Sequence, residues 1–158
     1  MSRSWMVLVS GLLLVGALLA SPAQAQQRYR VDDTGTRVLT GGIKMEWDRP
    51  SPVMGEAPTV TGVTPVYVRM NVKPWRGRSG RIFLTLPPQP FGELQVSWQA
   101  RQRLLAGAFV SGDRGGLVYA GPIDSDVLED TLLLTVKADG TRLERTEQLE
   151  FSFFIELD

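Results

Sequence analysis

The feature that most constrains this chain is a strict alternation of side chains near its end. Five apolar residues occupy every second position there: Leu149, Phe151, Phe153, Ile155 and Leu157. Successive side chains of a β-strand point to opposite faces, so the pattern predicts a strand with one wholly apolar face. At about 25 cal/mol per Å² of apolar surface, burial of that face contributes several kcal/mol. This segment is therefore expected to pack against a core.

The same period of two recurs along the chain. Alternating or apolar runs bounded by Gly and Pro predict further short strands at 43–47, 66–72, 82–86, 94–100, 104–110, 117–120 and 131–137. No segment has a convincing period of 3.6 residues, and Asp139-Gly140 predicts a hairpin turn after 131–137. Seven or eight short strands indicate an all-β fold, an antiparallel β-sandwich or else a small barrel, in a single domain over residues 26–158.

Residues 1–25 are typical of a cleaved secretory signal peptide. Arg3 precedes an apolar run of sixteen residues, Trp5 to Ala20, and Ala23-Gln24-Ala25 has the small-x-small form of a cleavage site. The alternative is a retained membrane anchor, but the run is shorter than the roughly 20 residues that span a bilayer. We therefore expect Gln26 to begin the mature protein, which is exported to the periplasm or cell surface of a Gram-negative bacterium.

The chain has neither cysteine nor histidine. Disulfides, thiolate or histidine metal sites and nucleophiles activated by imidazole are thus excluded, and an enzyme would have to rely on carboxylates, Tyr, Lys or Arg. No pair of acids has a sequence context that favours glycosidase chemistry. We expect no enzymatic activity, no cofactor and no metal. Seventeen basic residues balance seventeen acidic ones, so nucleic acid is not an expected partner.

An acidic group precedes the predicted strand at 131–137: Asp124, Asp126, Glu129 and Asp130. Oxygen-rich loops hold calcium, but this spacing does not match an EF-hand. We favour the interpretation that these acids are exposed to solvent at the start of the strand, where their charges disfavour pairing with the edge of another sheet.

A basic loop follows the strand at 66–72 and places four cations around a tryptophan: Lys73, Trp75, Arg76, Arg78 and Arg81. Such a loop is a candidate site for an anionic glycan or lipid headgroup. In the alternative interpretation it is a hairpin loop with Trp75 folded onto the sheet.

Charge is unevenly distributed along the chain. Residues 69–103 hold seven basic residues and one acid, whereas 113–158 hold four basic residues and eleven acids. Either the protein is dipolar and associates head to tail, or the two segments interleave in the fold and neutralise each other.

Leu94-Gln95-Val96-Ser97-Trp98 is similar to an apolar-x-Val-Ser-Trp strand of one bacterial family. Together with the signal, the cysteine-free domain and the alternating end at 147–158, it resembles fimbrial (pilin-like) subunits of chaperone–usher systems, of the alpha or class 5 type. The resemblance implies an incomplete immunoglobulin-like sandwich that is completed by a strand from a partner. The implied partners are a periplasmic chaperone, an usher and other fimbrial subunits.

The resemblance also implies a partner-strand groove beside the last strand, formed by Leu149, Phe151, Phe153 and Ile155. Residues 26–40 contain only Tyr29, Val31, Val38 and Leu39 as large apolar residues, which is a poor donor pattern and favours a minor subunit. The sequence therefore leaves two hypotheses open. One is a non-enzymatic minor fimbrial subunit acting by strand complementation, and the other is a self-complete binding module that uses the Trp75 loop.

Overall fold

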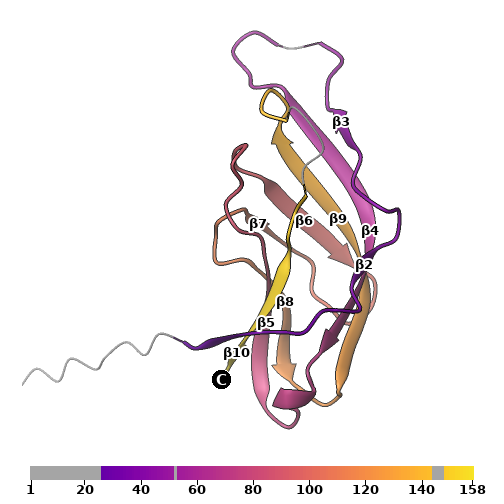
Figure 1. Cartoon of the computed structure of the whole chain (residues 1–158), viewed down its shortest axis with the longest axis vertical. Helices are drawn as coiled ribbons and strands as arrows, with labels where there is room; N and C mark the ends of the chain where they lie inside the picture. Colours follow the sequence, from indigo (N-terminus) through magenta and orange to yellow (C-terminus); the bar gives the residue numbers. More distant parts are fainter. Residues whose placement is uncertain (1–25, 52, 144–147) are drawn as a thin grey trace, which may run out of the picture.

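The computed structural model describes residues 26–51, 53–143 and 148–158, and in these residues the fold is an all-β sandwich of two antiparallel sheets (Figure 1). The strands are β1 (Arg28–Arg30), β2 (Arg37–Val38), β3 (Met45–Trp47), β4 (Thr59–Asn71), β5 (Ser79–Thr85), β6 (Gln95–Ala100), β7 (Gly107–Val110), β8 (Gly116–Pro122), β9 (Val127–Asp139) and β10 (Ser152–Leu157). A 3₁₀ turn, η1 (Lys73–Trp75), joins β4 to the loop before β5. The sequence-based prediction of an all-β sandwich is confirmed.

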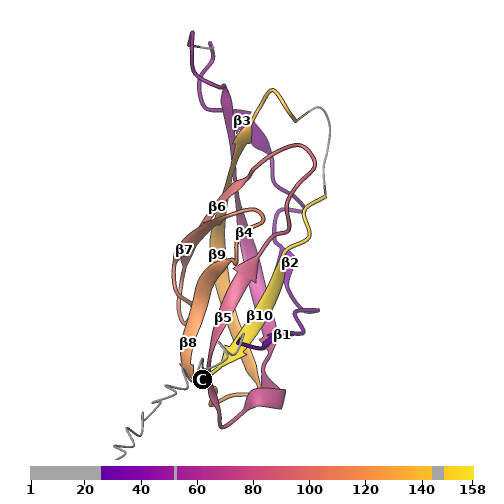
Figure 2. The same ribbon diagram turned by 90° about the vertical axis from the view of Figure 1, so that its left-hand side faces the viewer.

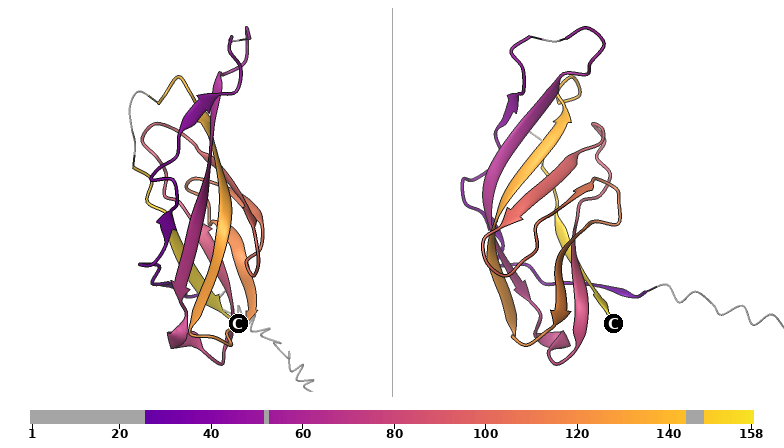
Figure 3. Two further views of the ribbon diagram at one scale, coloured as in Figure 1. Left: turned by 90° about the vertical axis from the view of Figure 1, so that its right-hand side faces the viewer. Right: turned by 180° about the vertical axis from the view of Figure 1, so that it is seen from behind.

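One sheet has the order β1-β10-β5-β8, and the other has the order β2-β4-β9-β6-β7 with β3 added beside β4. Figure 2, which is turned by 90° from Figure 1, shows that the two sheets lie as two layers. Seen from behind, β9, β6 and β7 lie in front (Figure 3). The long β4–β9 pair, thirteen residues in each strand, forms the centre of the larger sheet.

The core lies between the inward faces of the two sheets, as the period of two requires. Trp98, Met70, Ile82 and Leu132 are among its fully buried side chains. The indole Nε1 of Trp98 donates a 2.7 Å hydrogen bond to the Leu105 carbonyl oxygen, which satisfies its polar atom inside an apolar environment. Alternation of buried and exposed residues along β4 and β9 confirms the predicted inward faces of both strands.

Two sequence-based expectations need correction, and a third needs longer bounds. The hairpin expected after Asp139 does not form, because β10 pairs with β5 in the opposite sheet, where its apolar face covers the core. Residues 117–120 belong to a full strand, β8, and the strand expected from 104 begins only at Gly107. Residues 26–40, whose apolar residues form a poor donor pattern, contribute the short edge strands β1 and β2.

Candidate partner-binding groove

The outer edge of β10 is only partly covered. β1 pairs with its lower part, in the register Arg28↔Glu156, Tyr29↔Ile155 and Arg30↔Phe154. One further bond, from Val31 N to Phe153 O at 2.9 Å, ends this contact. Within the described residues, Leu149 to Phe151 make no backbone hydrogen bond, and the pairing with β5 begins at Ser152. The backbone that leads into β10 thus has main-chain donors and acceptors without partners among the described residues.

The edge is open because the N-terminal segment leaves it. After Val31 the chain crosses from one sheet to the other, where Asp32 forms a bridge with Asn71 and β2 then pairs with β4. Figure 1 shows this indigo segment passing across from β1 to β2. We call residues 31–36 the crossing segment. It covers the lower part of the space between β10 and β4 and leaves the upper part uncovered.

A groove of about 1410 Å³ occupies the uncovered space. Its walls are apolar side chains from both sheets: Val66, Val68, Leu84, Leu132, Leu134, Val136 and Phe153. Leu149 and Phe151 line it from the segment before β10, and Arg30, Asp33, Arg37 and Glu150 bring charge to it. An apolar hollow beside an unpaired strand edge has the chemistry to take an extended peptide, since it offers main-chain bonds and pockets for alternate side chains.

The structure brings three of the four residues expected at a partner-strand groove into this lining: Leu149, Phe151 and Phe153. The fourth, Ile155, is fully buried opposite Tyr29 of β1 and does not line it. Sequence reasoning missed the lining residues of β4 and β9, because their alternation marks them as inward-facing but does not reveal which inward positions stay uncovered.

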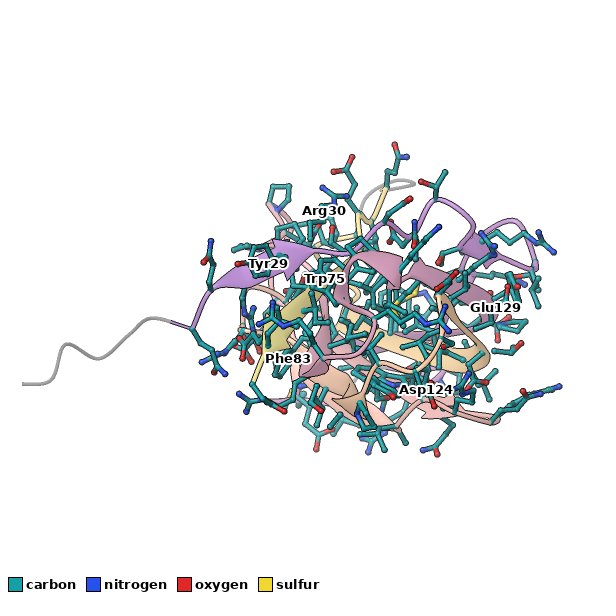
Figure 4. All side chains as sticks on the ribbon, turned by 90° about the horizontal axis from the view of Figure 1, so that it is seen from below. Tyr29, Arg30, Trp75, Phe83, Asp124 and Glu129 are labelled. Atoms are coloured by element: carbon teal, nitrogen blue, oxygen red, sulfur yellow. The ribbon has the colours of Figure 1, made fainter. Side chains whose placement is uncertain are left out.

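The basic loop does not form a converging site. The Trp75 ring packs against the core cluster and lies 6.3 Å from the Tyr29 ring, and Figure 4 shows the two side by side. Arg76 pairs with Asp126 at 3.0 Å, and Arg81 lies on β5 facing Glu156 at 3.6 Å. Lys73 and Arg78 are exposed. Trp75 is thus folded onto the sheet, as the alternative interpretation of this loop expects.

The acidic group is dispersed as well. Asp124 and Glu129 lie apart in Figure 4, the first paired with Arg103 at 3.4 Å and the second with Arg69 at 3.0 Å. A hydrogen bond from Tyr67, followed by the one from Arg69, holds the pKa of Glu129 below its ordinary value. Among the described residues, no three acids are grouped so that they could hold a metal ion. These two ion pairs and the Arg76–Asp126 pair connect the basic segment 69–103 with the acidic segment 113–158. The two segments therefore interleave in the fold.

Asp130 differs from its neighbours because it is buried, with 4% of its surface exposed. Its carboxylate accepts hydrogen bonds from the backbone N–H groups of Gln102, Arg103, Leu104 and Thr131 at 2.6–3.1 Å. Burial alone raises the pKa of Asp130, but these four donors outweigh it and hold the pKa below its ordinary value. This carboxylate supports the loop between β6 and β7.

A second buried carboxylate lies under β1. Glu156 is completely buried on the outer side of β10, where the alternation predicts a solvated residue. Its Oε1 accepts hydrogen bonds from Arg28 Nε at 2.6 Å and from Arg114, and Arg81 lies 3.6 Å from Oε2. Burial raises the pKa of Glu156, but the bonds and charges of Arg28 and Arg114 outweigh it and lower the pKa. We call these four residues the Glu156 cluster.

No family model, curated protein or solved structure matches this chain. The described residues contain no helix long and apolar enough to cross a membrane, and the segment expected to be a signal peptide lies outside them. The fold and the site together define a class of protein: an all-β sandwich with an apolar groove beside the unpaired backbone that leads into β10.

Proposed function

We propose that this protein is a non-enzymatic assembly module that binds an extended segment of a partner protein along the unpaired backbone that leads into β10. The observation that carries the proposal is the unpaired backbone of Leu149–Phe151, just before β10, beside an apolar groove. Main-chain groups left free at an edge recruit another strand, and the groove supplies sites for its apolar side chains.

The chain itself gives an example of this mode. β1 is an extended segment that adds to the outer edge of β10 in antiparallel orientation. The next residue, Val31, is inserted into the core with 1% of its surface exposed. A partner strand would continue the same line upward. This is the association expected of a minor fimbrial subunit of a chaperone–usher system, with an immunoglobulin-like fold, export by a signal peptide, and a chaperone, usher or other subunit as partner.

The second hypothesis, an anionic-ligand site at the Trp75 loop, has less support. Trp75 is half-buried against Tyr29, and Arg76 and Arg81 are engaged with acids of the chain itself. Exposed salt bridges have low energies, so Lys73, Arg76 and Arg78 retain the charge to attract an anion. Lys73 lines a hollow of about 240 Å³, but it shares this hollow with Asp32 and Asp126, whose carboxylates disfavour an anion, so the groove is the better-supported site.

The test uses a synthetic seven-residue peptide with Val at positions 1, 3, 5 and 7 and Ser or Lys between, blocked at both ends. We expect the purified protein to bind it, measured by fluorescence anisotropy of a labelled copy. Amide exchange at Leu149–Phe151 should slow, because those groups gain hydrogen bonds. A peptide of equal composition with its four Val residues adjacent is expected to bind at least tenfold more weakly.

The matched variants are Phe151→Ser, in the groove lining, and Phe154→Ser, on the other face of the same segment. Both phenylalanines are half-buried, so their removal alters stability comparably. We expect Phe151→Ser to weaken peptide binding at least tenfold and Phe154→Ser less than threefold. Equal effects of the two variants, or no binding of the alternating peptide, would refute the proposal.

A further inference from the structure

Two apolar side chains lie in the open at the middle of the larger sheet. Val63 of β4 is 53% exposed and Leu133 of β9 is 48% exposed, both on the face that points away from the core (Figure 3). Pro65 lies opposite Leu133 and Val63 lies opposite Thr135, so the two exposed side chains are diagonal neighbours. Neighbouring apolar side chains of this kind gain free energy when another surface covers them.

The middle of this face carries no charge across three strands. On the other side of β9, β6 places Gln99 opposite Leu133 and Ser97 opposite Thr135. We call six residues the central band: Val63, Pro65, Ser97, Gln99, Leu133 and Thr135. Covering the central band removes no ion from water, so a second sheet can pack on it without a large desolvation cost.

Opposite charges lie at equal distances on either side of the central band. Glu129 and Lys137 point to the same face of β9, and each is four residues from Leu133, about 13 Å along the strand. Both residues are exposed. This face of β9 therefore has an acid at one end, a base at the other end and a leucine at the midpoint.

The neighbouring strands repeat the arrangement with the signs reversed. Beside Glu129, Arg69 of β4 donates from Nε to Glu129 Oε1 at 3.0 Å. Beside Lys137, Thr61 of β4 lies opposite Glu46 of β3, which is exposed. One end thus has an acid on β9 and a base next to it, and the other end has a base on β9 and an acid farther along the same row.

This layout is complementary to a second copy of itself. A two-fold axis that lies between two such faces and crosses the strands at Leu133 brings Glu129 of each copy to Lys137 of the other. The same axis brings Arg69 towards the row that ends in Glu46 of the second copy. An axis parallel to the strands would instead set Glu129 against Glu129 and Lys137 against Lys137, which repel each other.

From this layout we propose that the outer face of the larger sheet is the contact between two copies of this protein, packed face to face with their β9 strands antiparallel. Such an interface is isologous, because the same patch serves both copies. The patch is about three strands wide and nine residues long, which is small for an interface, so the dimer should dissociate on dilution. The inference goes beyond the proposed function, and since the groove is lined from the opposite side of β4 and β9, both grooves stay open.

Sedimentation velocity of the purified protein, from about 1 to 300 µM, tests the dimer. We expect the mean mass to rise from that of a monomer towards that of a dimer. Leu133→Ser should raise the dissociation constant at least tenfold, because two leucines leave the contact. The matched control is Leu105→Ser in the loop between β6 and β7, which is 44% exposed and should change the constant less than twofold. A protein that stays monomeric throughout, or equal effects of the two variants, would overturn the proposal.

Charge reversal tests the antiparallel arrangement. Lys137→Glu places an acid against Glu129 of the second copy, so we expect the dissociation constant to rise at least tenfold. Adding Glu129→Lys to that variant restores opposite charges and should return the constant to within threefold of the parent. Arg78→Glu, which makes the same change of net charge in the loop before β5, should have less than a twofold effect. A double variant no tighter than Lys137→Glu would overturn the antiparallel arrangement.

The alternating seven-residue peptide separates this inference from the proposed function. At a saturating concentration it should leave the dissociation constant of the dimer within twofold, because it binds in the groove. A peptide that dissociates the dimer would place the contact between copies at the groove and overturn the inference. A protein that dimerises as expected but binds no peptide would overturn the proposed function and leave the dimer standing.

Discussion

Asp130 shows how a carboxylate without a ligand becomes structurally necessary. It replaces the hydrogen bonds that water would give to the N–H groups of Gln102, Arg103 and Leu104. A buried N–H without an acceptor costs free energy comparable to a lost hydrogen bond. The loop between β6 and β7 thus depends on a residue in β9.

Asp130→Asn is expected to lower the free energy of unfolding by about 1–3 kcal/mol, since the amide nitrogen is a donor facing other donors. Urea denaturation followed by tryptophan fluorescence measures the change. Asp124→Asn serves as control, because Asp124 is exposed and makes only a 3.4 Å contact with Arg103. Equal stability of both variants would show that the four N–H groups do not need the carboxylate.

At the scale of elements, periodicity predicts strands well and their pairing poorly. The inward positions of β4, β9 and β10 follow from a local rule, because neighbouring side chains of a strand alternate faces. The partner of a strand depends on long-range packing, so β10 beside β5 could not be derived from the Asp-Gly turn that precedes it. The family resemblance, rather than periodicity, predicts Leu149, Phe151 and Phe153 at a groove. Ile155 is excluded from the groove because β1 pairs with it. The sequence of β1 has no strong strand pattern, so this pairing could not be predicted.

β7 and β8 are held close to Trp98 by small residues. A Cβ on Gly107 would lie 2.7 Å from Cζ2 of Trp98, which is closer than packed atoms allow. Gly116 contacts the same ring from the other sheet. Because Gly107 and Gly116 have no side chain, the Trp98 indole can fill the space beside β7 and β8. This side of the sandwich lies opposite the groove.

Gly107→Ala is expected to destabilise the protein by about 1–3 kcal/mol, because the added methyl group must displace a buried indole. The midpoint of thermal unfolding and the near-ultraviolet circular dichroism of the tryptophans report this change. Gly42→Ala is the control, since its methyl group would meet nothing within 4 Å. A Gly107→Ala protein with an unaltered midpoint would mean that Trp98 repacks freely.

For the whole molecule, the folded state favours ionised carboxylates. Hydrogen bonds hold the pKa values of several acids below their ordinary values, among them Asp32, Asp48, Asp139 and Glu156. A group whose pKa is lowered by folding contributes stability that is fully present above its unfolded pKa, near 4, and is lost as the pH falls through its folded pKa.

We therefore expect the free energy of unfolding to be steady from about pH 7 to 5 and to fall steeply below pH 4.5. The difference in stability between the parent and Glu156→Gln should shrink over the same range, because protonation removes the charge that the variant lacks. Urea titrations at pH 7, 5, 4 and 3 measure both quantities. A difference that stays constant down to pH 3 would exclude an ionised Glu156 as the partner of Arg28.

The pairing of β1 with β10 also sets the order in which the protein can fold. Arg28 and Glu156 are 128 positions apart, so their contact cannot form before nearly the whole chain has been synthesised. Contacts between distant residues slow folding, because a long loop must close before they stabilise anything. The first strand of the sequence should consequently be the last to settle. Until it does, the whole edge of β10 is available to any other strand that arrives sooner.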